Sequence, residues 1–337
     1  MNREQAMKPV VRVLVCMLLL SGSALTCAGE ASAWHNGTLA HDGQQRYFRL
    51  YLPAKQQERP PLVILLHGGT QSMNKIFRRH AGATREWPVL AEEAGFLLLV
   101  PNGVNVRTGD AKGNHQNWND CRAAVAGSGA GSSADDVGFI RALIDRMATR
   151  FHIDRNRVYV TGASNGGMMS YRLAIELGDE IAAAAVFIAN LPVDNECRQA
   201  TRPVPMMIVN GTGDSVMPWN GGAVKGGGGR VQSAQETLEY WLRVNRVDRS
   251  GAQTTRLADV SGNDKSRVTR TRYPAAPGGA DVLFYTVEGG GHTMPHARHL
   301  VPGLLRMTLL GHQNRDFDSV RAAWEFLRSQ HLDQQAH

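Results

Sequence analysis

The chain has 337 residues, of which 42% are hydrophobic and 20% are charged, a composition typical of a globular protein long enough for one large α/β domain. Its formal net charge is +7 at pH 7. The basic residues are scattered, without a Lys/Arg run or interleaved aromatic residues, so the charge indicates solubility and argues against nucleic-acid binding.

The N-terminus has the three parts of a cleavable export signal. Arg3, Lys8 and Arg12 form a basic segment, and residues 13–20 form an apolar segment. Residues 31–33, Ala-Ser-Ala, have the small-x-small pattern that signal peptidases cleave. The apolar segment is too short to span a bilayer, and no other stretch is long and apolar enough to predict a membrane span.

We expect cleavage after Ala33, which leaves residues 34–337 as a mature chain that is secreted or held in the periplasm. A lipoprotein anchored through Cys27 is the alternative, although the residues before it match a lipobox poorly. The mature chain keeps two cysteines, Cys121 and Cys197. Because such a pair is more often bonded than free in an oxidising compartment, we expect a disulfide between them.

Apolar runs alternate with helical patterns along the rest of the chain. Outside the stretch 158–169, strands are predicted over residues 46–52, 62–66, 96–100, 182–188, 204–209, 268–273 and 282–287, and helices over 85–94, 136–151, 235–244 and 316–329. Continuous apolar runs are typical of strands covered on both faces. The alternation predicts an α/β fold: one domain with a mostly parallel sheet and helices on both faces. The Gly-rich segments 103–134 and 220–229 are expected to be loops.

The stretch 158–169 reads as a buried strand, a serine between glycines and the first turn of a helix. Gly162, Ser164 and Gly166 fit the pattern G-x-S-x-G of the nucleophile elbow. Five residues are weakly specific, but the strand before them and the helix after them strengthen the prediction. A serine hydroxyl is a weak nucleophile, so it also needs a base, an acid that orients the base, and donors for an oxyanion.

Two strand exits offer these partners. Asp214 follows the strand 204–209, and His292 follows the strand 282–287, each on a glycine-rich turn. Functional groups of open parallel sheets gather at the carboxyl ends of the strands. The chain order Ser164, Asp214, His292 is that of α/β-hydrolases. We therefore predict His292 as the base, because its pKa lies near neutrality, and Asp214 as the acid that fixes its tautomer.

Other residues offer weaker alternatives. Asp214 alone would also suit a turn cap. Glu288 lies only four residues before His292, too close in sequence to reach the far side of its ring. His296, His299 and His312 stand in irregular polar sequence, where we expect them to be solvated. The spacing of the first two suits a metal, but no further ligands cluster nearby, so no metal is predicted.

The oxyanion hole is expected from two backbone N–H groups. One belongs to Asn165, directly after the serine, and the other to the loop after the strand 62–66. Within that loop Gly69 and Thr70 are both candidates. His67 is expected to brace the loop by hydrogen bonds and not to act as a second base.

Together these motifs resemble the secreted α/β-hydrolase esterases grouped with poly(3-hydroxybutyrate) depolymerases and feruloyl esterases. The resemblance spans roughly residues 40–329 and implies a Ser/Asp/His ester hydrolase without a cofactor. Two aspartates, Asp135 and Asp136, fit a helix start and a loop brace. The matching segments are residues 66–71, 117–119, 135–140, 161–169, 210–214, 218–222 and 289–293.

The chain departs from that family beside the predicted base. Family members often have Trp-Pro after the Gly-His-Thr element, whereas this chain has Met294-Pro295, and residues 296–313 are also unusual. These departures concern the choice of substrate more than the chemistry. The side chains expected to line the pocket, with ordinary core packing as the alternative, are Trp118, Met168, Trp219 and Met294.

The sequence therefore predicts an exported carboxylic-ester hydrolase that forms an acyl-enzyme and acts on hydroxyalkanoate oligomers, polyester or aryl esters of the feruloyl type. Two alternatives remain open. A non-catalytic binding protein would use the same scaffold, and an acyltransferase would use the same three residues with an acceptor other than water. The oligomeric state is left open.

Overall fold

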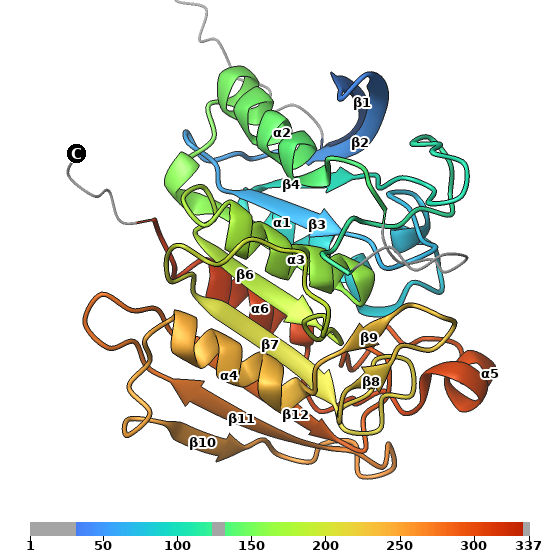
Figure 1. The fold of residues 1–337 in the computed structure, drawn as a ribbon, viewed down its shortest axis with the longest axis vertical. Helices are drawn as coiled ribbons and strands as arrows, with labels where there is room; N and C mark the ends of the chain where they lie inside the picture. Colours follow the sequence, from blue (N-terminus) through green and yellow to red (C-terminus); the bar gives the residue numbers. More distant parts are fainter. Residues whose placement is uncertain (1–31, 123–131, 333–337) are drawn as a thin grey trace, which may run out of the picture.

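The computed structural model describes residues 32–122 and 132–332. The expected export signal therefore falls on residues outside the described part, as does a piece of the predicted loop 103–134. The main sheet has 10 strands in the order β1-β2-β4-β3-β5-β6-β7-β12-β11-β10 (Figure 1). Its strands are β1 Ala33–His41, β2 Gln44–Leu52, β3 Leu62–Leu66, β4 Leu97–Pro101, β5 Val158–Ala163, β6 Ala183–Phe187, β7 Met206–Gly211, β10 Gln253–Arg256, β11 Arg267–Tyr273 and β12 Val282–Glu288.

The central strands from β4 to β12 run parallel, and antiparallel strands extend the sheet at both edges. This arrangement places the carboxyl ends of β3, β5, β7 and β12 at one edge of the sheet. The longer helices are α1 Trp87–Ala94, α2 Asp136–Phe151, α3 Asn165–Glu176, α4 Ala234–Val244 and α6 Ser319–Leu327. Short helical turns are η1 Lys75–Phe77, η2 Gly82–Glu86, η3 Arg155–Arg157, α5 Gly303–Leu305 and η4 Arg306–Leu310.

Helices cover both faces of the sheet, as the continuous apolar runs predicted. Helices α2, α3 and α4 lie on one face, and α1 and α6 lie on the other (Figure 1). Successive side chains of β3 point to opposite faces of the sheet. Leu62, Ile64 and Leu66 pack with α2 and α3. Val63 and Leu65 pack with α1 and α6. The predicted mostly parallel α/β-hydrolase sheet is thus confirmed.

The start of α2 has the two carboxylates that the sequence assigned to it. Asp135 caps the helix by accepting a hydrogen bond from the Gly138 N–H at 2.9 Å. Asp136 is buried and pairs with the buried guanidinium of Arg46. It also accepts the N–H of Asn119 at 2.8 Å, which ties the long loop to the helix. Burial raises the pKa of Asp136, and the Arg46 charge opposes that shift.

Some elements lacked a sequence signal. Strand β10 has four exposed polar residues, so no apolar periodicity marks it. Strand β1 begins at Ala33 and is an edge strand with mostly half-buried side chains. The predicted loop 220–229 contains part of a small hairpin formed by β8 Gly222–Ala223 and β9 Arg230–Val231.

Cys121 and Cys197 are joined by a disulfide, with their Cα atoms 5.1 Å apart. The bond links the long loop after β4 to the segment after β6. Its partners are 76 residues apart in the sequence. Within residues 32–122 and 132–332, none of the helices combines the length and apolar character that a bilayer crossing requires.

Candidate active site

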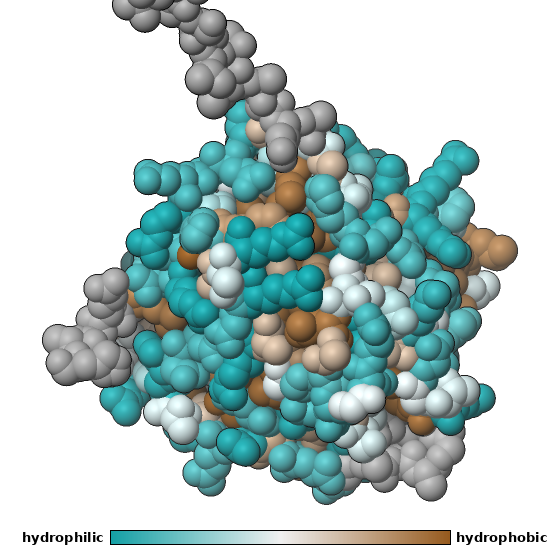
Figure 2. All heavy atoms as spheres, turned by 90° about the horizontal axis from the view of Figure 1, so that it is seen from above, coloured by the Kyte–Doolittle hydropathy of each residue, from teal (hydrophilic) through white to brown (hydrophobic). Residues whose placement is uncertain are grey.

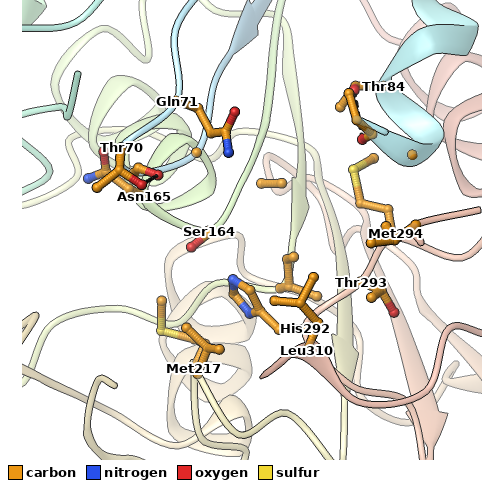
Figure 3. Close-up of a pocket in the computed structure, with 18 of the residues that line it drawn as sticks. Thr70, Gln71, Thr84, Ser164, Asn165, Met217, His292, Thr293, Met294 and Leu310 are labelled. Carbon is orange, nitrogen blue, oxygen red and sulfur yellow. Dashed lines mark hydrogen bonds between the residues drawn. The ribbon is translucent and has the colours of Figure 1, made fainter. Parts of the chain in front are cut away.

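Ser164 lies in a sharp turn between β5 and α3. Its backbone has φ of 57° and ψ of −125°, a conformation that is strained for a residue with a side chain. The Ser164 N–H donates to the Phe187 carbonyl at 3.0 Å, which holds the turn against β6. The serine side chain makes no cap with α3, so its hydroxyl points away from the helix into the pocket (Figure 3).

The glycines beside Ser164 are required by close backbone packing. A Cβ at Gly162 would stand 2.5 Å from the carbonyl oxygen of Gly166. A Cβ at Gly166 would collide with the carbonyls of Leu66 and His67 at the end of β3. The pattern G-x-S-x-G is therefore imposed by the contact between this turn and the neighbouring strand exit.

Asp214 and His292 lie at the carboxyl ends of the adjacent strands β7 and β12, and they are in direct contact. His292 Nδ1 lies 2.7 Å from Asp214 Oδ2. The two side chains are 10% and 2% exposed, so water has little access to the pair. The other carboxylate oxygen accepts the N–H groups of Val216 and Met217, each at 2.8 Å. The carboxylate is thereby fixed in orientation before any substrate binds.

His292 presents its remaining ring nitrogen to the serine. Figure 3 shows the His292 ring and the Ser164 hydroxyl directed toward each other on one wall of the pocket. With Nδ1 hydrogen-bonded to the carboxylate, Nε2 is the nitrogen available to accept a proton. The structure thus brings together the three side chains that the sequence selected from separate strand exits. Glu288, the competing acid, is instead exposed and pairs with Arg256 at 3.3 Å.

Hydrogen bonding in the loop after β3 distinguishes the two candidate oxyanion donors, Gly69 and Thr70. The Thr70 N–H donates to Asn117 Oδ1 at 2.7 Å and is already occupied. The Gly69 N–H has no partner among the described residues, and a Cβ at Gly69 would stand 3.5 Å from the Cβ of Asn165. Asn165 is the first residue of α3, where backbone N–H groups lack helical partners. Gly69 and Asn165 are thus close neighbours beside Ser164, and neither backbone N–H has a hydrogen-bond partner within the described part of the chain.

His67 braces this loop as a neutral side chain. Its Nε2 accepts the Gly103 N–H at 3.0 Å, and its Nδ1 donates to the Gly68 carbonyl at 2.8 Å. Complete burial lowers the pKa of His67 to about 4. The Trp118 indole donates to the His67 carbonyl at 2.9 Å, which links the long loop to the end of β3.

A cavity of about 590 Å³ opens beside Ser164 and His292. Met294 lines it, as expected, but the other three expected lining residues do not. Trp118 and Met168 are fully buried in the core, and Trp219 packs partly buried against Phe284. The prediction for these three was wrong because large apolar residues near a site pack into the core as readily as they face the ligand.

Residues without a sequence signal complete the cavity. Its apolar wall includes Ile76, Ile188, Met217, Leu305 and Leu310. Most of the surface in Figure 2 is hydrophilic, with apolar side chains confined to small patches. The segment formed by α5 and η4 is an exception at the rim of the cavity, since its residue Leu304 is 77% exposed.

His296 is not solvated, contrary to the prediction. It is fully buried, and its Nδ1 accepts the N–H groups of Arg298 and His299 at 3.0 Å each. Its Nε2 lies 3.1 Å from Asp318 Oδ2 and 3.8 Å from Glu86 Oε2. The sequence missed this site because both carboxylates are distant in the chain.

Glu86, His296 and His299 have side-chain atoms close enough together to suggest a metal site. The hydrogen bonds argue against one. A nitrogen that accepts two N–H groups has no proton, so neutral His296 has its proton on Nε2, the atom a metal would need. Glu86 is also paired with the Arg321 guanidinium at 2.8 Å. The donor set therefore fits a buried ion-pair network that ties the segment after His292 to α6.

The fold and the strand exits define an α/β-hydrolase. A family model described as esterase PHB depolymerase matches residues 46–218, more than half of the 337 residues. The chain belongs to this family, whose relatives below include feruloyl esterases and depolymerases. The protein is accordingly a carboxylic-ester hydrolase.

Curated relatives agree with this assignment. A putative esterase, NocK, of Nocardia uniformis subsp. tsuyamanensis is 28% identical over 85% of this chain and 80% of its own length. Feruloyl esterase D of Neurospora crassa is 26% identical over 92% of this chain and 94% of its own length. A poly(3-hydroxybutyrate) depolymerase of Ralstonia pickettii is 32% identical over 40% of this chain, and the match covers only 27% of that protein.

Solved structures support the fold. An acetyl xylan esterase from Aspergillus awamori matches 77% of this chain and 94% of its own, with a TM-score of 0.51 and 17% identity. An S-formylglutathione hydrolase from Agrobacterium tumefaciens matches 90% of this chain and 97% of its own, with a TM-score of 0.50 and 14% identity. At these identities the likeness concerns the fold alone.

Proposed function

We propose that the protein is an exported serine esterase in which Ser164, His292 and Asp214 form a catalytic triad. The contact that carries the proposal is the 2.7 Å hydrogen bond between His292 Nδ1 and Asp214 Oδ2, formed at two strand exits beside the strained Ser164. This geometry provides a base with a fixed tautomer at a hydroxyl that the backbone holds exposed.

The chemistry follows from these positions. His292 Nε2 takes the proton of Ser164 Oγ as that oxygen attacks the ester carbonyl, and the carbonyl oxygen becomes negatively charged. The N–H groups of Gly69 and Asn165 stabilise this charge. His292 then gives the proton to the leaving alcohol, and the C–O bond of the ester breaks. Water activated by His292 releases the acid and restores the hydroxyl.

The relatives and the cavity support a proposal for the substrate class. Relatives are named feruloyl esterase and poly(3-hydroxybutyrate) depolymerase, so their names refer to feruloyl esters and to hydroxybutyrate polyester. A cavity of about 590 Å³ with walls of Ile, Val, Leu and Met suits a short, mostly apolar acyl chain or oligomer. We propose small or oligomeric esters of these two kinds as substrates.

Export is also part of the proposal. The basic, apolar and small-residue segments of residues 1–33 support a signal peptide cleaved after Ala33. The disulfide between Cys121 and Cys197 is in keeping with an oxidising compartment outside the cytoplasm.

A substrate panel tests the function. The mature protein and its Ser164→Ala variant are assayed with short 4-nitrophenyl esters, methyl ferulate and hydroxybutyrate oligomers. The wild type is expected to hydrolyse at least one group, and the variant none of them above background. Equal turnover by both proteins would contradict the proposal.

A further inference from the structure

The lining of the cavity has positive charge and no carboxylate. Its described residues include the cationic side chains of Arg122 and Lys225, and they include neither Asp nor Glu. Among the described lining residues, a charged group on a substrate would therefore meet positive and neutral side chains and no carboxylate.

The charge of Arg122 is already balanced. Arg122 Nε and Nη2 donate to the Asp120 carboxylate at 3.0 and 2.7 Å, and both side chains are buried. Its Nη1 donates to the Gly228 carbonyl. Arg122 therefore fixes the β8–β9 hairpin over the cavity and leaves little charge for a ligand.

Lys225 is the cation that remains unbalanced. It lies on the same hairpin, its side chain is exposed, and its ammonium has no ion-pair partner within the described ranges. Its backbone N–H donates to the Val216 carbonyl at 3.1 Å. Val216 in turn donates its own N–H to Asp214, so the position of Lys225 is fixed relative to the triad.

Apolar residues share the cavity lining with Lys225. Val216, Met217 and Val224 line the cavity next to Lys225. A carboxylate that binds Lys225 would therefore lie beside an apolar wall, where the attraction is screened less than on an open surface. A lysine is a compact charge on a flexible stem, so it can meet a carboxylate at a range of chain lengths.

We propose that Lys225 binds a carboxylate of the ester substrate and gives the enzyme a preference for anionic esters. This inference rests on the proposed function. Within the proposed substrates, the enzyme then prefers esters with a free acid a few bonds from the scissile carbonyl, as in short oligomers of hydroxy acids, over neutral esters. Lys225 is a specificity-determining residue and takes no part in the bond-breaking steps.

The test compares two esters that differ only in charge: the dimer of 3-hydroxybutyrate with a free carboxylate, and the same dimer capped as a primary amide. Initial rates are measured by chromatography for the wild type, Lys225→Gln and the control Lys55→Gln. Lys55 is also exposed, but it lies against Gly95, between α1 and β4, and does not line the cavity.

We expect the wild type and Lys55→Gln to favour the acid over the amide by about fivefold in kcat/KM, as for one partly exposed ion pair. In Lys225→Gln the ratio should fall to about one, and in Lys225→Glu it should drop below one. About 0.5 M NaCl should reduce the wild-type ratio.

An equal acid-to-amide ratio in the wild type and Lys225→Gln would overturn the inference, whatever the absolute rates. Absence of hydrolysis of both dimers would count against the proposed function for this substrate. In that case calorimetric binding of the acid to Ser164→Ala, with and without Lys225→Gln, still decides the preference. Equal affinities there would overturn it, and weaker binding after Lys225→Gln would support it.

Discussion

At the scale of single residues, backbone strain and backbone hydrogen bonds fix the groups of the candidate site. The strained turn exposes the Ser164 hydroxyl, and the Asp214 carboxylate is held by two backbone N–H groups as well as by His292. Because the N–H of Thr70 is occupied, we propose the N–H of Gly69 as the second oxyanion donor. In the proposed mechanism, the positions of these groups are therefore fixed by the fold before substrate arrives.

The role of Asp214 is tested by Asp214→Asn. An amide in this position can either accept a hydrogen bond from the His292 Nδ1–H or donate one to Nδ1. The imidazole therefore loses its fixed tautomer. We expect kcat to fall by about 10⁴-fold with the fold intact. The matched control is Glu288→Gln, at an exposed carboxylate four residues before His292, which should keep kcat within about twofold. A similar loss in both variants would argue against Asp214 as the orienting acid.

At the scale of elements, the site is formed by strand exits. The carboxyl ends of β3, β5, β7 and β12 meet at one edge because these strands run parallel. The contact between the serine turn and the end of β3 requires glycine, and this makes the turn sensitive to added volume.

Gly166→Ala tests that contact. The new methyl group would meet the carbonyls of Leu66 and His67, so we expect the free energy of unfolding to drop by about 1–3 kcal/mol. Gly303→Ala is the control, because a Cβ there meets nothing within 4 Å. Urea unfolding followed by circular dichroism measures both. Equal stability of the two variants would show that the turn accommodates a side chain.

The elements, and the meeting of Ser164, Asp214 and His292 at one edge of the sheet, could be predicted because their signals are local or follow from topology. Apolar runs marked the central strands, and the rule of carboxyl ends selected Asp214 and His292. The pocket wall could not be predicted in the same way. Whether Trp118 or Met168 faces a cavity or the core depends on packing between elements, which periodicity does not encode.

The buried network around His296 shows a second limit. Its carboxylates, Glu86 and Asp318, come from η2 and from the N-terminus of α6, far from His296 in the chain. Polar sequence alone therefore suggested solvent where the structure has a buried ion-pair network. The sequence could not separate Gly69 from Thr70 as candidate oxyanion donors for the same reason. The N–H of Thr70 is occupied by the side chain of Asn117, which is distant in the chain.

At the scale of the whole molecule, stability depends on pH through His67. Its folded pKa of about 4 lies below the ordinary value of 6.5, so the native state binds fewer protons than the unfolded chain. The contribution of neutral His67 to the free energy of unfolding is complete above pH 6.5 and is lost as the pH falls toward 4. From pH 7 to 5 the loss should be about 2 kcal/mol of unfolding free energy.

The measurement is urea unfolding at pH 7 and pH 5 for wild type and His67→Gln. The variant should be less stable at pH 7, since it loses the bonds to Gly68 and Gly103, but it should lose less stability on acidification. His312→Gln, at an exposed histidine, should follow the wild type. The same pH slope in all three proteins would contradict a role for His67.

The disulfide acts on the whole chain by restricting the unfolded state. A bond between residues 76 positions apart is expected to contribute about 4 kcal/mol by chain entropy. Cys121→Ala combined with Cys197→Ala should lower the urea midpoint, and reduction of the wild type should do the same. Unchanged unfolding after complete reduction would mean that the loops are held by their other contacts.

The most direct test of the central claim is the mass of the protein after reaction with a fluorophosphonate, followed by peptide mapping of the adduct. The proposed triad predicts one stoichiometric adduct on Ser164, strongly slowed in Asp214→Asn and absent from Ser164→Ala. A folded protein that stays unlabelled, or that is labelled on another residue while hydrolysing esters, would contradict Ser164 as the nucleophile.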